Sequence, residues 1–370
     1  MRTTGAHLRS LGLLLAAGVL VTGCAAVNER NLAAGAGQQY SGSLVGAGSS
    51  AQQAAMQGWT AGFAGVQPEV TVNYDPVGSG GGREQFLAGG TDFAGSDAFL
   101  DDEELAEAEA RCGPDGVFEL PNYIAPIAVV YNLDGLDELR LSPTTLAAIF
   151  DQRITDWDDP AIAEDNPDVT LPAVPITPVN RSDESGTTEN FVEYLSAAAS
   201  EAWPHEVDGN WPVSGGEAAQ GNSGVVGAVG AGNGTIGYAD LSQAGDLGVA
   251  RIRVGDEYVA PSAEAAAAVV ENSEPTEGRG EYDYAIEVNR DTSGSGEYPI
   301  VLISYHIGCM TYDDSQVAEL VRAFMSYVVS EPGQDAAALV AGSAPISEGL
   351  REQALRAIDA IAGPGERRGS

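Results

Sequence analysis

The fold is decided by residues 43–100, which read SLVGAGSSAQQAAMQGWTAGFAGVQPEVTVNYDPVGSGGGREQFLAGGTDFAGSDAFL. Three short apolar segments in this stretch are typical of strands: 43–45, 70–74 and 92–95. The first is followed by small residues and then by Met56, Trp59 and Phe63, whose spacing predicts a helix. A second, shorter helix is expected around 86–87. Strands that alternate with helices in this way predict an α/β fold.

The same alternation continues along the chain. Further strands are expected at 125–131, 175–179, 235–238 and 298–307. Further helices are expected at 143–150, 187–195, 221–229, 316–329 and 348–361. The neighbourhood of 273–296 is rich in Glu, Gly and Ser and is interpreted as a surface excursion. A folded part of about 325 residues favours two lobes over one core.

Four segments share one design, in which small residues with glycine or a hydroxyl follow a strand and, in three of them, precede a helix. They are 46–50 (GAGSS), 78–82 (GSGGG), 95–97 (GSD) and 181–187 (RSDESGT). Free N–H groups at a helix start favour an anion, and glycine lets the backbone approach a ligand. Each segment alone is also explained by helix capping. Together they predict an anion-binding site.

These segments also carry a family resemblance. GAGSSAQ, VGSGGG, DFAGSDAFL, ITDWDDPAI and NRSDESGTT, in this order, resemble the phosphate-binding protein of the Pst-type phosphate ABC transporter. The resemblance implies a type II periplasmic-binding-protein fold, with two α/β lobes joined by a two-strand hinge and the ligand in the cleft. Lobe I is expected at 41–130 plus 304–365, and lobe II at 131–303. The implied function is to capture inorganic phosphate outside the cytoplasm and deliver it to an importer permease.

The resemblance also implies which residues bind phosphate. They are Ser49, Ser50, Ala51, Ser79, Asp97, Arg181, Ser185, Gly186 and Thr187. Arg181 would supply the one full positive charge and be held in place by Asp183. Some family members have a threonine and an aromatic residue where this chain has Ser50 and Ala51, so the hydroxyl and the amide remain while an aromatic contact is lost.

Asp97 is the informative residue of this set, because a carboxylate opposes an anion unless the anion carries a proton. Ionised aspartate only accepts hydrogen bonds, so protonated orthophosphate can satisfy it, whereas sulfate has no proton to donate. A site built around a ligand hydroxyl rejects analogues that lack it by about 10⁴ to 10⁵. The alternative is that Asp97 merely caps a turn after a short strand.

The N-terminus predicts export. Residues 1–23 join a basic start to a short apolar run and read as a signal peptide. Val-Thr-Gly before Cys24 resembles a lipobox, so Cys24 is the expected lipid anchor to the cell membrane and 24–40 a flexible tether. The alternative is ordinary cleavage near Ala25 or Ala26, with Cys24 lost. In an oxidising compartment, the remaining cysteines, Cys112 and Cys309, favour one disulfide.

Composition narrows the classes of molecule that the protein can bind. The net charge is −37, and all 17 basic residues are arginine. Such a surface repels nucleic acid and anionic lipid. The sequence has no CxxC motif and no Cys/His cluster that would indicate a metal site. We expect a monomeric protein that needs no cofactor and is not an enzyme. Three rival hypotheses stay open: a phosphate-ester hydrolase, a binding protein for another oxyanion, and a phosphate-responsive surface protein that feeds no transporter.

Overall fold

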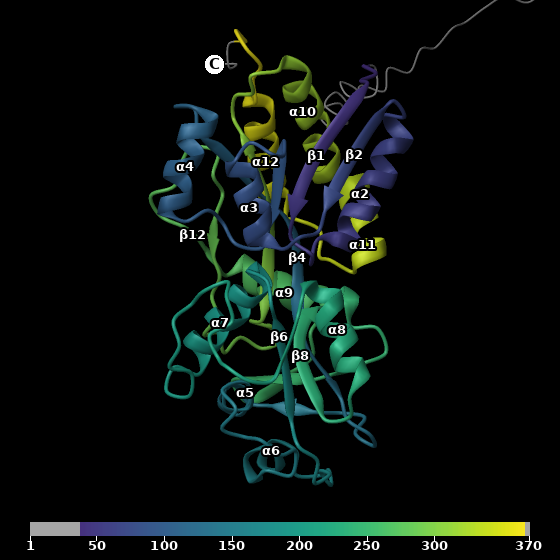
Figure 1. Cartoon of the computed structure of the whole chain (residues 1–370), viewed down its shortest axis with the longest axis vertical. Helices are drawn as coiled ribbons and strands as arrows, with labels where there is room; N and C mark the ends of the chain where they lie inside the picture. Colours follow the sequence, from purple (N-terminus) through teal and green to yellow (C-terminus); the bar gives the residue numbers. More distant parts are fainter. Residues whose placement is uncertain (1–37, 367–370) are drawn as a thin grey trace, which may run out of the picture. The chain divides into compact units, whose positions relative to one another are not determined.

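A mixed nine-stranded sheet runs through the protein, in the order β2-β1-β3-β14-β4-β8-β6-β7 with β9 paired to β4 (Figure 1). The computed structural model describes residues 38–366. From Tyr40 onward the described residues form one compact unit.

The strands are β1 Gly42–Gly48, β2 Val70–Asp75, β3 Phe93–Ser96, β4 Val117–Asn132, β5 Arg140–Leu141, β6 Thr177–Arg181, β7 Glu217–Ala219, β8 Thr235–Asp240, β9 Gly248–Val249, β10 Arg251–Val254, β11 Glu257–Val259, β12 Glu274–Pro275, β13 Ile286–Glu287 and β14 Val301–Cys309. The α-helices are α2 Gln53–Val66, α3 Ser79–Leu87, α4 Asp102–Cys112, α5 Pro143–Phe150, α6 Pro160–Asp165, α7 Gly186–Ala198, α8 Gly221–Ala231, α9 Ala263–Glu271, α10 Ser315–Val329, α11 Glu331–Ala341 and α12 Glu348–Ala360.

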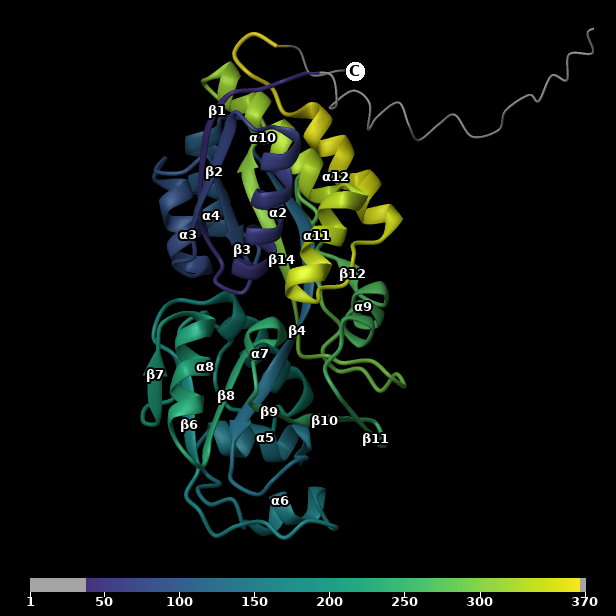
Figure 2. The same ribbon diagram turned by 90° about the vertical axis from the view of Figure 1, so that its right-hand side faces the viewer.

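The long strand β4 connects the two halves of this sheet. Its residues 117–126 pair antiparallel with β14, and its residues 127–132 pair antiparallel with β8. Nearly every residue of β4 is buried, which is why its sequence is apolar without alternation. In Figures 1 and 2 the elements accordingly gather into two groups on either side of the middle of β4.

We call these groups lobe I and lobe II. Lobe I contains β1–β3, α2–α4 and α10–α12, and lobe II contains β6–β8 and α5–α8 (Figure 2). The α/β architecture with two lobes agrees with the expected fold class. The boundaries expected at 130/131 and 303/304, and the hinge at these points, stay predictions.

Helix α11 was missed by the sequence analysis, as were α6 and α9. Helix α11 lies between the two expected C-terminal helices and packs against α2, where Trp59 donates from Nε1 to the Gly333 carbonyl at 2.9 Å. Pro332 and Gly333 suggest a turn, but here Ser330 caps the helix and the proline lies in its first turn. The expectation of two C-terminal helices was therefore wrong.

Two further findings concern the cysteines and the expected attachment to the membrane. Cys112 at the end of α4 and Cys309 at the end of β14 are joined by a disulfide within lobe I. Among the described residues, no helix has the length and apolar character required to cross a membrane. Cys24, with the expected signal peptide and most of the tether, lies outside the described residues.

Candidate functional site

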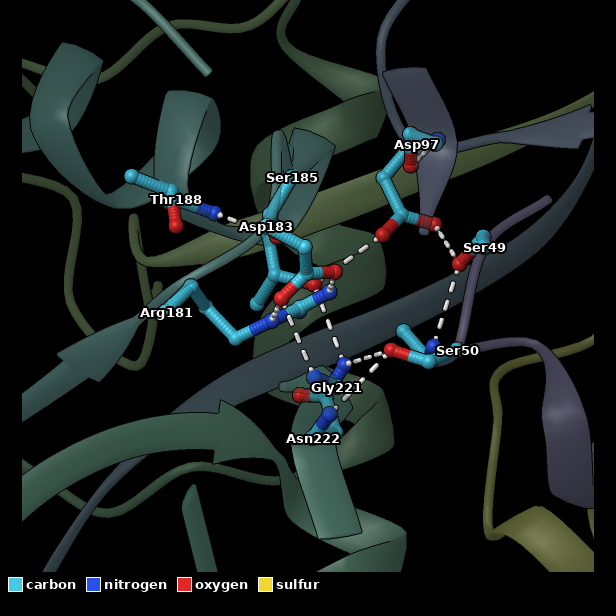
Figure 3. Close-up of polar contacts among 12 residues, drawn as sticks. Ser49, Ser50, Asp97, Arg181, Asp183, Ser185, Thr188, Gly221 and Asn222 are labelled. Carbon is cyan, nitrogen blue, oxygen red and sulfur yellow. Dashed lines mark hydrogen bonds and ion pairs between the residues drawn. The ribbon is translucent and has the colours of Figure 1, made fainter. Parts of the chain in front are cut away.

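The expected site residues come together where the two lobes touch. With two neighbours found in the structure, the polar set consists of Ser49, Ser50, Ser79, Asp97, Arg181, Asp183, Ser185, Gly186, Thr187, Asn222 and Ser304, and we call it the interlobe cluster (Figure 3). It combines the starts of α2, α3, α7 and α8 with the ends of β3 and β6. Helix starts present N–H groups that the helix itself cannot satisfy, so the cluster is rich in donors.

The turn from β1 into α2 places Ser49 against Asp97. Gly48 has φ +143°, and a Cβ there would lie 1.8 Å from the Gly95 carbonyl oxygen, so only glycine fits. Ser49 Oγ accepts from the N–H groups of Ala51 (3.1 Å) and Gln52 (3.2 Å). Its proton is donated to Asp97 Oδ1 at 2.5 Å. The Ser49 hydroxyl therefore holds the turn that precedes α2 and also orients Asp97.

Asp97 is the acceptor at the centre of the cluster, and 3% of it is exposed. Ser49 and Ser304 donate to Oδ1, the latter at 2.7 Å, and Thr187 from lobe II donates to Oδ2 at 3.0 Å. Two carboxylate oxygens offer about four lone-pair positions, so one position on Oδ2 is left for a further donor. These bonds come from hydroxyls rather than from the backbone of a turn, which the turn-cap alternative would require.

The pKa of Asp97 reflects two opposing effects. Burial raises it, while the hydroxyls of Ser49, Ser304 and Thr187 and the charge of Arg181 lower it. Burial prevails, and the pKa of Asp97 lies above its ordinary value. A carboxylate buried in this way is stabilised by a ligand that donates a hydrogen bond to it.

Arg181 supplies positive charge from the end of β6, and its side chain is 1% exposed. Its Nε donates to Asp183 Oδ1 at 2.8 Å, and its Nη2 donates to Asp183 Oδ2. Its Nη1 is buried and has no hydrogen-bond partner among the described residues. Burial raises the pKa of Asp183, but the bond to Arg181 and the Gly221 N–H outweigh it, so that pKa is lowered. Asp183 thus holds the guanidinium while Nη1 stays available.

Helix α7 brings lobe II against Asp97. Ser185 caps this helix by accepting from the Thr188 N–H at 3.2 Å. A Cβ at Gly186 would lie 2.8 Å from Asp97 Cβ, so a larger residue would push the lobes apart. Asn190, one turn further on, donates from Nδ2 to the Asp97 carbonyl at 2.7 Å.

The remaining site residues make contacts within lobe I and between the lobes. Within lobe I, Oγ of Ser79 at the start of α3 accepts from the Asp97 N–H at 3.1 Å. Across the lobes, Gln243 Nε2 donates to the Ser50 carbonyl at 2.8 Å, and Arg83 pairs with Glu184 at 3.1 Å. Ala51 is fully buried behind these contacts. The expected residues therefore share one desolvated site; their role in binding an anion stays a prediction.

Two members of the cluster were missed by the sequence analysis. Ser304 lies within a buried strand, where no loop or helix start marks it. Asn222 follows Gly221 at the start of an expected glycine-led helix, which is the signal used for the other segments. That signal was available, and it was not applied to this helix.

The cluster contains two carboxylates, those of Asp97 and Asp183. Among the described residues, no group of three or more His, Cys, Asp or Glu side chains is arranged to hold a metal ion. The site is instead a set of donors around one buried acceptor, which suits a small oxyanion that carries a proton.

Comparison with known proteins agrees with this geometry. Residues 33–332 match the model of the PBP superfamily domain. The chain is 37% identical over 363 residues to phosphate-binding protein PstS 3 of Mycobacterium leprae, covering 94% of this chain and 97% of the relative. It is 35% identical over 364 residues to phosphate-binding protein PstS 2 of Mycobacterium tuberculosis, with coverage of 94% and 97%.

A solved structure shares the fold. It is that of a high affinity periplasmic phosphate-binding protein, PfluDING, bound with phosphate at pH 8.5. The TM-score is 0.67 at 24% identity, and the match covers 85% of this chain and 92% of the other.

Proposed function

The chain belongs to the PBP superfamily and, within it, to the phosphate-binding proteins named PstS, and from this we propose that it captures inorganic phosphate between its lobes and delivers it to the permease of an ABC importer. The observation that carries the proposal is the buried Asp97, which has one acceptor position left inside a cluster of donors.

The donors in the cluster suit the oxygens of a tetrahedral anion. They include Arg181 Nη1, the hydroxyl protons of Ser50 and Ser79, and the N–H groups of Gly186 and Thr187 at the start of α7. Hydrogen bonds to charged groups contribute roughly 1.5–3 kcal/mol each. Several of them support binding at about micromolar concentration or tighter, or about −8 kcal/mol and below.

Asp97 supports phosphate over other oxyanions. Phosphate near neutral pH still carries a proton that can occupy the remaining position on Oδ2, whereas sulfate would bring a bare oxygen against a carboxylate. Burial of Asp97 and Arg181 strengthens this distinction, because charges interact more strongly in a desolvated site than in solvent. The −37 net charge of the chain opposes anion binding weakly, since exposed charges are screened over about 8–10 Å at ordinary salt.

The remaining assignments follow from the family and the N-terminus. We propose an extracytoplasmic monomer that is anchored to the cell membrane through a lipid on Cys24. We further propose that the protein binds its ligand without chemical change. A hydrolase would require an activated nucleophile or a metal pair, whereas the hydroxyls of Ser49, Thr187 and Ser304 are committed to holding Asp97.

The proposal is tested by the contents and the activity of the purified protein. Native mass spectrometry is expected to find one phosphate per chain, and a phosphate-ester assay is expected to find no turnover above buffer. Protein that shows no phosphate before or after incubation with excess phosphate would contradict the binding function. Turnover that disappears in Asp97→Asn would instead favour the hydrolase.

A further inference from the structure

Asn222 is a buried residue at the second position of α8 (Figure 3), and its side-chain amide donates to two hydroxyls of the interlobe cluster, those of Ser50 and Thr187. We propose that Asn222 is a positioning residue, which directs the Ser50 proton toward bound phosphate and the Thr187 proton toward Asp97. The inference rests on the proposed function and adds a residue that sets the direction of two hydroxyl hydrogen bonds in the site.

The orientation of the Asn222 amide is fixed by Asp240. The backbone N–H of Asp240 donates to Asn222 Oδ1 at 2.8 Å, and an N–H can face only the oxygen of the amide. Asp240 is itself held, because Tyr123 donates to Oδ2 at 2.9 Å and the Ser242 N–H donates to Oδ1 at 2.9 Å. The Nδ2 group of Asn222 is therefore turned toward the cluster.

The first consequence concerns Ser50. The backbone N–H of Asn222 donates to Ser50 Oγ at 3.1 Å, and Asn222 Nδ2 donates to the same oxygen at 3.0 Å. A hydroxyl has two lone pairs and one proton, so both acceptor positions of Ser50 are taken. The Ser50 hydroxyl can act toward a ligand only as a donor, which suits the oxygen of an anion.

The second consequence concerns Thr187. Asn222 Nδ2 also donates to Thr187 Oγ1 at 3.3 Å, and Thr187 donates its proton to Asp97 Oδ2 at 3.0 Å. Because Thr187 Oγ1 accepts a hydrogen bond from Asn222, its own O–H is directed to the carboxylate of Asp97. One amide thus sets the direction of two hydroxyls that lie on opposite lobes.

The decisive variant is Asn222→Asp, which keeps the size of the side chain and the acceptor for the Asp240 N–H but replaces the donor with an acceptor. Ser50 and Thr187 would then turn their protons toward the new carboxylate, away from phosphate and Asp97. Loss of the Ser50 bond, together with the added negative charge, predicts phosphate binding weaker by about 100-fold or more. Asn222→Ala, which only removes the amide, is expected to weaken binding by about 10-fold.

Two readouts separate positioning from mere support of the fold. The defect of Asn222→Asp is expected to shrink between pH 8 and pH 5, because protonation of the new carboxyl restores a donor. In a double-mutant cycle, Asn222→Asp is expected to cost less in a Ser50→Ala background, since part of its effect passes through Ser50.

Asn166→Asp is the matched control. Asn166 is 2% exposed, accepts the Arg140 N–H through Oδ1 at 2.9 Å and donates twice through Nδ2, but it caps α6 away from the cluster. The Asn166→Asp variant measures how a buried amide-to-carboxylate change affects the protein when it lies outside the cluster. Its phosphate affinity is expected to stay within twofold of the native value.

Calorimetric titration of native protein and variants with phosphate decides the inference, with thermal unfolding recorded for each. Native affinity retained within twofold in folded Asn222→Asp and Asn222→Ala would overturn it. An affinity loss that is independent of pH and additive with Ser50→Ala would do the same. Native protein that binds no phosphate would overturn the proposed function and this inference together.

Discussion

Replacement of Asp97 by asparagine tests the proposal that this carboxylate makes the site prefer phosphate to sulfate. The exchange keeps Oδ1 for Ser49 and Ser304 and puts an amide nitrogen where Oδ2 accepts from Thr187. That nitrogen is a donor, so it repels the phosphate O–H and attracts a bare sulfate oxygen. The selectivity of the site should therefore move in favour of sulfate.

The size of the effect follows from the contacts. Losing one hydrogen bond from phosphate to a charged carboxylate costs roughly 1.5–3 kcal/mol, or about 10- to 150-fold in affinity. Sulfate gains in the same exchange, because two charges about 4 Å apart near a protein surface interact by about 4 kcal/mol. The ratio of phosphate affinity to sulfate affinity should therefore fall by at least about 100-fold.

The assay is calorimetric titration of native and Asp97→Asn protein with each anion at pH 7. Asp165→Asn is a matched control, since Asp165 is 5% exposed and accepts from the Ser142 N–H and the Tyr258 hydroxyl outside the cluster. The control should keep the native ratio. An Asp97→Asn protein that folds and keeps its phosphate preference within twofold would refute the reasoning.

Three further predictions follow from other contacts. Arg181→Ala should weaken phosphate binding by at least about 100-fold, because it removes the charged donor and leaves Asp183 unpaired; calorimetric affinity within twofold of native would contradict this. Burial raises the pKa of Asp240 from 3.8 to about 7, so its contribution to stability is present below pH 3.8 and is lost as pH rises through 7. Between pH 5 and pH 8 this loss amounts to about 2.7 kcal/mol, at about 1.4 kcal/mol for each of the two pH units below the folded pKa. Asp240→Asn should remove it from the unfolding free energies measured in urea at these two pH values, and equal pH dependence in both proteins would count against it. Reduction of the Cys112–Cys309 disulfide should lower the unfolding free energy by roughly 2–4 kcal/mol in urea titrations, with phosphate affinity kept within twofold; intact mass showing two free thiols in the native protein would reject the bond.

The local parts of the site could be predicted from the sequence, because they follow rules of helix starts. Glycine and hydroxyl residues before α2, α3 and α7 indicated free N–H groups, and the structure brings these starts together. The contacts that organise them could not be read locally. Ser304 donates to Asp97 from 207 residues away, and Asn222 reaches Ser50 across 172 residues. Only the folded sheet places such pairs together.

Most of residues 273–296 are exposed or half-buried, as expected for a surface excursion, but the sequence did not show that charged residues within it are buried. Within this segment Arg290 is 4% exposed and Asp283 is 7% exposed. Arg290 donates to the Pro299 carbonyl and pairs with Glu193 of α7, while Asp283 pairs with Arg279. Charged residues become buried when each finds a partner, and a single sequence does not reveal these pairings.

The central claim is that a buried, hydroxyl-held carboxylate makes the protein a receptor for a protonated oxyanion. The most direct measurement is a competition titration of phosphate-free native protein, in which phosphate is added in the presence and in the absence of excess sulfate. We predict micromolar or tighter phosphate binding that excess sulfate leaves unchanged within twofold. Sulfate that displaces phosphate at comparable concentration would contradict the account.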